Sequence, residues 1–255
     1  MRLLLKSRKW IQLFFFIVSS ILIYLFIKNT LLIVHKLCPY SVVCFGTLSF
    51  KQGGYIYPIS LLIFAALTML VMWFGRAFCG FICFFGTLQE YLYRIIPKNA
   101  KAVLKISHSN EKSIGLIKYV VLGATIILSV FGLSKAFMNY CPITTLAWIK
   151  NAGVSSLIFL VITLILSLFI ERFWCRFLCP YAALMNVISK IGKFLRIDAF
   201  YIKIEQNKCI DCGACTEACP MNIDLQHKVI IKNPNCIKCL KCIDVCPLKD
   251  TIKWR

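Results

Sequence analysis

Two copies of one cysteine spacing constrain the fold of this 255-residue chain more than any other feature. Each copy reads Cys-x2-Cys-x2-Cys-x3-Cys-Pro, and the copies begin at Cys209 and Cys236. Zinc sites pair two Cys-x2-Cys units instead, and thiols in a reducing cytoplasm do not form disulfides. The doubled run is the spacing that binds paired [4Fe–4S] clusters in bacterial ferredoxins, where the fourth cysteine of each run ligates the other cluster.

That rule divides the eight cysteines into two predicted ligand sets. The first set is Cys209, Cys212, Cys215 and Cys246. The second set is Cys236, Cys239, Cys242 and Cys219. A module this small has little hydrophobic core, so its iron clusters are expected to hold it together. We therefore predict a C-terminal α+β domain of the bacterial 2[4Fe–4S] ferredoxin type over residues 197–255.

The rest of the chain is unusually apolar. Hydrophobic residues make up 60% of the sequence and charged residues 16%, whereas soluble domains are nearer half and a quarter. Four apolar stretches approach the length of about 20 residues that a bilayer requires. They cover residues 10–27, 55–74, 114–133 and 154–170. The sequence thus predicts an all-α membrane bundle of four transmembrane helices over residues 1–196.

The charge distribution predicts an orientation for this bundle. Lys and Arg outnumber Asp and Glu by 30 to 10, a formal charge of +20. The basic residues gather before the first stretch, between the second and third, and after the fourth, and such flanks stay on the cytoplasmic side. We expect a multi-pass protein of a prokaryotic inner or plasma membrane with both termini in the cytoplasm. Lys118, near the start of the third stretch, is expected to extend its stem to the interface.

An internal repeat organises the apolar part. The segment Arg76-Ala-Phe-Cys79-Gly-Phe-Ile-Cys83 is followed 96 residues later by Arg172-Phe-Trp-Cys175-Arg-Phe-Leu-Cys179. Each half is expected to cross the membrane in the same direction, so the prediction is two parallel repeats.

Cysteines four residues apart share one helix face, so the repeat predicts that two such pairs meet. The resulting site would contain Cys79, Cys83, Cys175 and Cys179. Nearby Arg76, Arg172 and Arg176 would favour thiolates and offset the charge of an anionic cluster. The site would hold a third cluster or act as a redox-active thiol group. The simpler alternative is small packing cysteines beside arginines that obey the positive-inside rule.

A further site is predicted at the outer face. Its candidate residues are Cys38, Cys44, Cys141 and His35. Cys38 and Cys44 would close a small disulfide in an oxidising compartment, or all four residues would mark an outer redox or quinone site. The imidazole of His35 suits proton uptake from a quinol, but a solvated interfacial histidine is the favoured explanation.

The polar tail from Arg172 to Arg255 indicates the class of partner. It carries fourteen basic and seven acidic residues, so it would attract an acidic ferredoxin or flavodoxin, or an oxidoreductase subunit. Attraction to anionic lipid headgroups explains the same charge. Nucleic acid is not an expected partner, because no groove-reading motif accompanies the basic residues.

The ordered set of motifs resembles the NapH/MauN-type family of membrane polyferredoxins. The resemblance rests on Gly75-Arg76-x2-Cys79-Gly80-x2-Cys83, on Arg172-x-Trp174-Cys175-Arg176-x2-Cys179-Pro180, and on the doubled ferredoxin run. It extends from His35-x2-Cys38-Pro39 to Pro247. The resemblance implies four spans, cytoplasmic [4Fe–4S] clusters and electron transfer between the quinone pool and redox partners.

One residue departs from the family pattern. Phe84 follows Cys83 where the family usually has the proline that Pro180 supplies in the second half. Because proline ends a helix and phenylalanine does not, we expect the first helix to be free to continue past Cys83.

These observations predict a membrane-bound iron–sulfur protein that passes electrons between a cytoplasmic partner or the quinone pool and a redox partner, as a quinol dehydrogenase or oxidoreductase subunit. The cofactors carry the chemistry, so no catalytic acid, base or nucleophile is predicted. One alternative is a thiol or metal reductase, or metalloenzyme assembly factor, that delivers electrons to the extracytoplasmic side. Another is a redox sensor.

Overall fold

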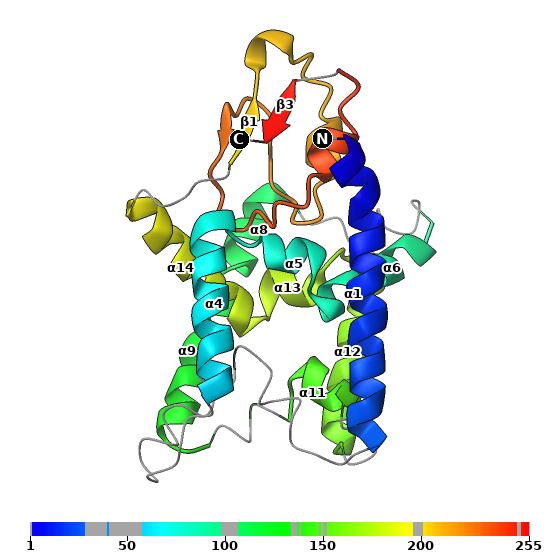
Figure 1. The fold of residues 1–255 in the computed structure, drawn as a ribbon, viewed down its shortest axis with the longest axis vertical. Helices are drawn as coiled ribbons and strands as arrows, with labels where there is room; N and C mark the ends of the chain where they lie inside the picture. Colours follow the sequence, from blue (N-terminus) through cyan, green and yellow to red (C-terminus); the bar gives the residue numbers. More distant parts are fainter. Residues whose placement is uncertain are drawn as a thin grey trace.

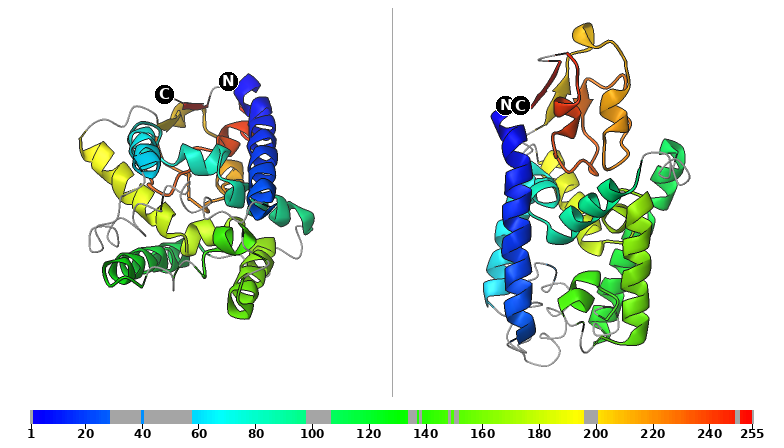
Figure 2. Two further views of the ribbon diagram at one scale, coloured as in Figure 1. Left: turned by 60° about the horizontal axis from the view of Figure 1, so that its bottom comes forward. Right: turned by 90° about the vertical axis from the view of Figure 1, so that its right-hand side faces the viewer.

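The computed structural model describes residues 2–28, 40, 58–97, 107–133, 137, 139–147, 149, 152–195, 201–248 and 251–254. Four helices run along the long axis of the molecule, and the C-terminal residues form a small module at one end of them (Figure 1). Both ends of the chain lie at this module end (Figure 2).

The four long helices follow the apolar stretches of the sequence. They are α1 (Arg2–Lys28), α4 (Pro58–Phe74), α9 (Ile117–Val130) and α12 (Val154–Phe169). α4 and α9 end close to Gly75 and Gly132, whose positive φ angles are the backbone conformation that commonly terminates a helix.

The predicted four-span transmembrane bundle is wrong. Within the described residues, no helix combines the length and the apolar character needed to cross a membrane. α4, α9 and α12 contain 17, 14 and 16 residues, whereas a span needs about 20 at a rise of about 1.5 Å per residue. The third apolar stretch is interrupted by a turn at Gly115 and Leu116, and α12 ends one residue before the fourth stretch does.

The internal repeat appears as two copies of a three-helix unit. In the first copy α4 is followed by α5 (Ala77–Phe81) and α6 (Phe84–Ile95). In the second, α12 is followed by α13 (Phe173–Phe177) and α14 (Pro180–Phe194), and each helix begins 96 residues after its counterpart. α12 packs against α6 and α14 packs against α4, so the long helix of each unit contacts the last helix of the other.

Two further short helices lie outside the repeat units in the described part of the chain. They are α8 (His108–Ile114), which precedes α9, and α11 (Pro142–Ala147), which precedes α12. The short helices α5 and α13 lie across the middle of the molecule, between the long helices (Figure 1).

The C-terminal module contains a three-stranded antiparallel sheet in the order β2-β1-β3. Its elements are β1 (Ile202–Ile204), the 3-10 helix η2 (Gln206–Lys208), α15 (Ala214–Glu217), β2 (Ile230–Ile231), α16 (Lys241–Asp244) and β3 (Ile252–Trp254). Ile202 pairs with Ile231 on one side and Trp254 on the other. The buried module residues form one hydrophobic core with Val71 of α4 and Met185 of α14, so the module packs directly on the helices.

Polar contacts reinforce this packing at Lys118 of α9. Its side chain is 1% exposed and its Nζ donates to Asn235 Oδ1 of the module at 2.5 Å. The expectation that Lys118 extends to an interface is therefore wrong. A buried ammonium needs hydrogen-bond acceptors, and the docked module supplies one.

A buried carboxylate joins four separate parts of the chain. Glu90 of α6 is 2% exposed and lies 3.0 Å from Arg8, 2.9 Å from Arg172 and 3.0 Å from Lys241. Burial alone would raise the pKa of Glu90, but Arg172, Lys241 and Arg8 hold it well below its usual range. The ionised carboxylate therefore ties α1, α6, the turn before α13 and the module together.

Replacing Glu90 by glutamine is expected to destabilise the iron-loaded chain by about 3 to 5 kcal/mol, because it leaves buried cations without their counter-charge. Arg94→Gln is the matched control. Arg94 also contacts Glu90 at 2.9 Å, but its side chain is 42% exposed, so its loss should cost less than about 1 kcal/mol. Denaturant unfolding of both variants tests the difference, and equal effects would contradict the buried clamp.

Candidate functional site

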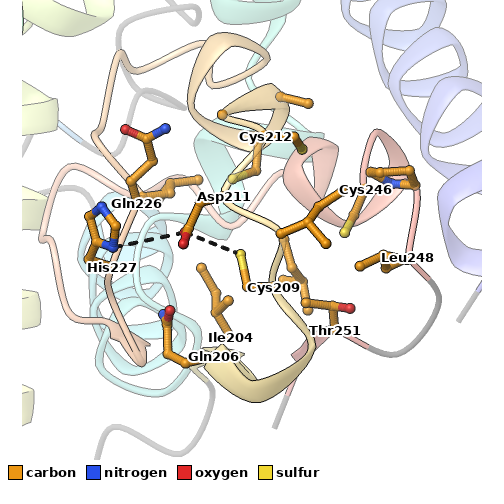
Figure 3. A pocket seen from close by; sticks show the side chains of 17 residues that line it. Ile204, Gln206, Cys209, Asp211, Cys212, Gln226, His227, Cys246, Leu248 and Thr251 are labelled. Carbon is orange, nitrogen blue, oxygen red and sulfur yellow. Dashed lines mark hydrogen bonds and ion pairs between the residues drawn. The ribbon is translucent and has the colours of Figure 1, made fainter.

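The first predicted ligand set lines one pocket of the module. Its four cysteines come from the loop after η2, from α15 and from the segment after α16: Cys209, Cys212, Cys215 and Cys246. Figure 3 shows this pocket, with the side chains of Cys209, Cys212 and Cys246 arranged around it. Cys212 is exposed, so this pocket lies close to the surface.

The second predicted set lines a separate pocket. It contains Cys219, Cys236, Cys239 and Cys242. Cys239 and Cys242 are buried, and Ile202, Ile231 and Leu240 complete the lining. This pocket belongs to the core shared with α4, α5 and α14, so it faces the helices rather than solvent.

The two cysteine loops have the same backbone conformation. Asp211 and Gly213 have φ angles of 48° and 73°, and Lys238 and Leu240, each 27 positions later, have 47° and 61°. Left-handed residues are rare outside glycine, so their repetition at matched positions shows that both loops follow one path. The path turns successive cysteines of each run toward the same pocket.

The described cysteines fit iron–sulfur clusters better than other cysteine sites. All thirteen are free thiols, and no three potential metal ligands among the described residues converge tightly enough for a single ion. Each pocket is lined by four cysteines, which is the number of thiolates that a [4Fe–4S] cluster takes. Burial raises the pKa of Cys219 to about 12 and that of Cys236 to about 11, so both stay protonated until metal binding displaces the proton.

The structure also brings the repeat cysteines together. Cys79 lies in α5 and Cys175 in α13, while Cys83 and Cys179 are the residues that cap α6 and α14. The pKa of Cys175 is raised well above its usual value by burial and by the nearby Cys83, Cys179 and Cys79. We call these four cysteines the repeat site.

The two halves of the repeat site match despite Phe84. Cys83 has φ −61° and ψ 111°, and Cys179 has φ −70° and ψ 112°. The expectation that the first helix continues past Cys83 is therefore wrong. In a continuous helix, Cys83 N would donate to the carbonyl of Cys79. That carbonyl accepts from Arg172 Nη1, and Cys83 N donates to Phe78 O. A contact from the other repeat thus accompanies the helix break in the half that lacks the proline.

The three arginines beside the cysteines have different partners. Arg172 Nη2 donates to Glu90 Oε2 at 2.9 Å, and Arg76 Nη1 donates to Asn186 Oδ1 at 3.2 Å. Arg176 binds Glu111 of α8, with its Nε 2.8 Å from Glu111 Oε1. Neither Glu90 nor Asn186 was predicted from the sequence. Their spacing of 96 positions, which is also the spacing of Arg76 and Arg172, could have indicated them.

A glycine lets the repeat site approach the second module pocket. A Cβ atom on Gly80 would lie 2.5 Å from Ile237 O and 3.5 Å from Cys239 Cα, closer than packed atoms allow in the first case. Arg172 also lies near both sites, because Cys175 and Cys239 both contribute to raising its pKa. The residue after Cys79 therefore touches the loop that carries Cys239.

Most of the predicted outer site lies outside the described residues. His35, Cys38 and Cys44 lie outside the described residues. Cys141 is a partly buried free thiol directly before α11, at the end of the molecule opposite the module (Figure 1). The outer site stays a prediction.

Comparisons with known proteins agree with this geometry. Residues 55–102 and 152–197 both match a family described as a 4Fe-4S binding domain, and residues 201–248 match a 4Fe-4S dicluster domain. The first match covers the two repeat units in turn, and the second covers the module.

Three curated relatives illustrate the range of similar proteins. Uncharacterized protein MJ0750 of Methanocaldococcus jannaschii is 28% identical over 66% of this chain and 67% of its own. The putative electron transport protein YccM of Escherichia coli is 28% identical over 69% and 50%, respectively. The methylamine utilization ferredoxin-type protein MauN of Methylobacillus flagellatus is 30% identical over 57% and 48%. The chain thus spans about half the length of the last two, and no solved structure matches it.

Proposed function

The chain belongs to the NapH/MauN-type family of [4Fe–4S] polyferredoxins, and we propose that it relays single electrons between a redox partner at its module and a third redox centre at the repeat site. The chain is an iron–sulfur electron-transport protein whose cofactors are [4Fe–4S] clusters. Each cluster supplies one-electron chemistry when bound, so no bond forms or breaks in a relay step.

The two module pockets suggest the order of the relay. Cys209, Cys212, Cys215 and Cys246 would hold the first cluster, and Cys219, Cys236, Cys239 and Cys242 the second. Cys212 is exposed, whereas Cys239 and Cys242 are buried against the helices. A partner would therefore exchange electrons with the first cluster, and the second would connect it to the helical part.

The convergence of the four repeat cysteines carries the proposal of a third centre. Burial raises the pKa of Cys179 to about 12 and that of Cys83 above its usual value, so metal-free thiols here would be poor nucleophiles at neutral pH. Poor nucleophiles do not suit thiol exchange, and the convergence of one cysteine pair from each repeat supports a third [4Fe–4S] cluster ligated by Cys79, Cys83, Cys175 and Cys179.

The iron content tests this third centre. Purified without oxygen, the chain should contain about twelve irons with it and about eight without it. Cys79→Ser and Cys175→Ser should each remove about four irons and one set of electron paramagnetic resonance signals. The control variant is Cys141→Ser, because Cys141 lies directly before α11, at the end of the molecule opposite the module. It should retain all of the irons and all of the signals. Unchanged iron and spectra in both repeat-site variants would refute the third cluster.

The contact at Gly80 supplies the route between the module and the repeat site. Electron tunnelling falls steeply with distance, so direct packing of Gly80 on Ile237 and Cys239 would shorten the gap between the second cluster and the third. Cys212 of the first pocket is exposed, whereas Cys239 of the second is buried and close to Gly80. The relay would thus pass from the first cluster to the second and then to the third.

Gly80→Ala should slow transfer between the module and the repeat site several-fold, because the added methyl group must push the Ile237–Cys239 loop away. Gly123→Ala on α9 is the matched control, since a Cβ there meets nothing within 4 Å. Photoreduction of the module followed by time-resolved spectroscopy measures the rate. Equal rates in the two variants, with full iron in both, would contradict this route.

We also propose that the chain associates with a prokaryotic inner or plasma membrane through the outer faces of its long helices. The buried face of α12 contains the polar residues Ser156, Thr163 and Ser167, whereas the apolar residues Val154 and Ile158 are exposed. A helix that faces water shows the opposite arrangement, with its polar side exposed. Large exposed apolar surface of this kind marks a contact with lipid or protein, and the charge of +20 favours anionic headgroups.

Cell fractionation tests the location. The chain should sediment with membranes, remain there in high salt and be released by detergent, because apolar contacts rather than charge alone would hold it. Recovery in the soluble fraction after a high-salt wash would contradict this proposal without bearing on the iron content.

A further inference from the structure

The two halves of the repeat site have unequal charge environments, although their backbones match. Arg76 and Arg172 occupy equivalent positions, and both are 0% exposed. Each reaches across to the equivalent position of the other repeat, where Arg172 finds the carboxylate of Glu90 and Arg76 finds the amide of Asn186. Among the described residues, Arg172 therefore has a carboxylate as its counter-charge and Arg76 has none.

The Asn186 amide is held in place by its own contacts. Its Nδ2 donates to Asn235 Oδ1 at 2.8 Å and to Tyr119 OH at 3.0 Å, which turns its oxygen toward Arg76. That oxygen accepts from Arg76 Nη1 alone, and the Nε and Nη2 atoms of Arg76 are buried without a hydrogen-bond partner. Two donor atoms of the Arg76 guanidinium therefore have no hydrogen-bond acceptor in the described part of the chain.

The nearby acidic groups are already engaged. Glu90 contacts Arg8, Arg172 and Lys241, and Glu111 binds Arg176. Among the described residues, no carboxylate contacts Arg76. Lys118, also buried, is close enough to Arg76 to repel it electrostatically, and this increases the local excess of positive charge. An unpaired buried cation costs several kcal/mol, so this region requires an anion.

Arg76 lies one helical turn from a repeat-site cysteine, because it directly precedes α5 and its carbonyl accepts a hydrogen bond from Cys79 N at 3.1 Å. A [4Fe–4S] cluster with four thiolate ligands is anionic, and it becomes more negative by one charge on reduction. A buried guanidinium beside it favours the reduced form, because net charge and hydrogen bonds set the potential of such clusters.

We infer that Arg76 is the counter-ion of the repeat-site cluster and sets its reduction potential, whereas its counterpart Arg172 serves the Glu90 clamp. The inference rests on the proposed third centre and adds the residue that tunes it. Reduction brings one electron and no proton to the site, and Arg76 stays protonated throughout. Arg76 is a positioning residue, since its donors act on the cluster without supplying a ligand.

Redox titration followed by electron paramagnetic resonance tests the inference on the full iron-loaded chain. Arg76→Gln should shift the midpoint of the repeat-site cluster to more negative potential, and Arg76→Lys should restore most of the shift by keeping the charge. Asn186→Asp should also shift it negatively, because the new carboxylate pairs with Arg76 as Glu90 does with Arg172. The midpoints of the two module clusters should stay unchanged, and Arg94→Gln should move none of the three.

The outcomes separate this inference from the proposed function. Eight irons in the wild-type chain would overturn both. Twelve irons with an unmoved midpoint in Arg76→Gln would overturn the role of Arg76 alone, and so would an equal shift in all three clusters. Should Arg76→Gln lose the third cluster, Asn186→Asp decides, because it retains Arg76: a negative shift supports the inference and an unchanged midpoint refutes it.

Discussion

The buried carboxylate of Glu90 is the interaction on which the rest of the architecture depends. Arg8, Arg172 and Lys241 approach it from α1, from the turn before α13 and from the module, so one charge joins segments that are far apart in the sequence. Burying a single unpaired charge would be prohibitive, and a shared anion makes burial of several cations tolerable. The same Arg172 donates to the carbonyl of Cys79, so the clamp also shapes the first cysteine pair.

Two-fold repetition explains how two Cys-x3-Cys pairs that are far apart in the sequence form one four-cysteine site. Each unit contributes one cysteine pair, and the exchange of contacts between α12 and α6 and between α14 and α4 brings the pairs together. The units differ in charge at one equivalent pair of positions that both arginines contact, Glu90 and Asn186. Arg172 therefore pairs with a carboxylate and Arg76 with a neutral amide, so a symmetric scaffold has an asymmetric electrostatic field.

Short-range patterns in the sequence predicted the described structure well where they act locally. The cysteine runs predicted which cysteines share a pocket of the module, although the ligand assignment itself stays a prediction. The 96-residue offset predicted the repeat. The four-span bundle was wrong. In the third stretch, hydropathy does not register the turn at Gly115 and Leu116, so the predicted helix was too long. Lys118 was misplaced because its acceptor, Asn235, is more than a hundred residues away in the sequence.

The sequence by itself determined the cofactor class, since thiolate spacing within one loop is enough to wrap an iron–sulfur cluster. It also determined that two equivalent halves exist. Only the tertiary structure decided how the halves and the module meet. The break after Cys83 comes from an arginine of the other repeat, and the approach of Gly80 to Cys239 comes from packing of the module on α5. Both features depend on contacts between segments that are far apart in the sequence. Local sequence patterns do not indicate which of these segments pack together or which buried charges form pairs.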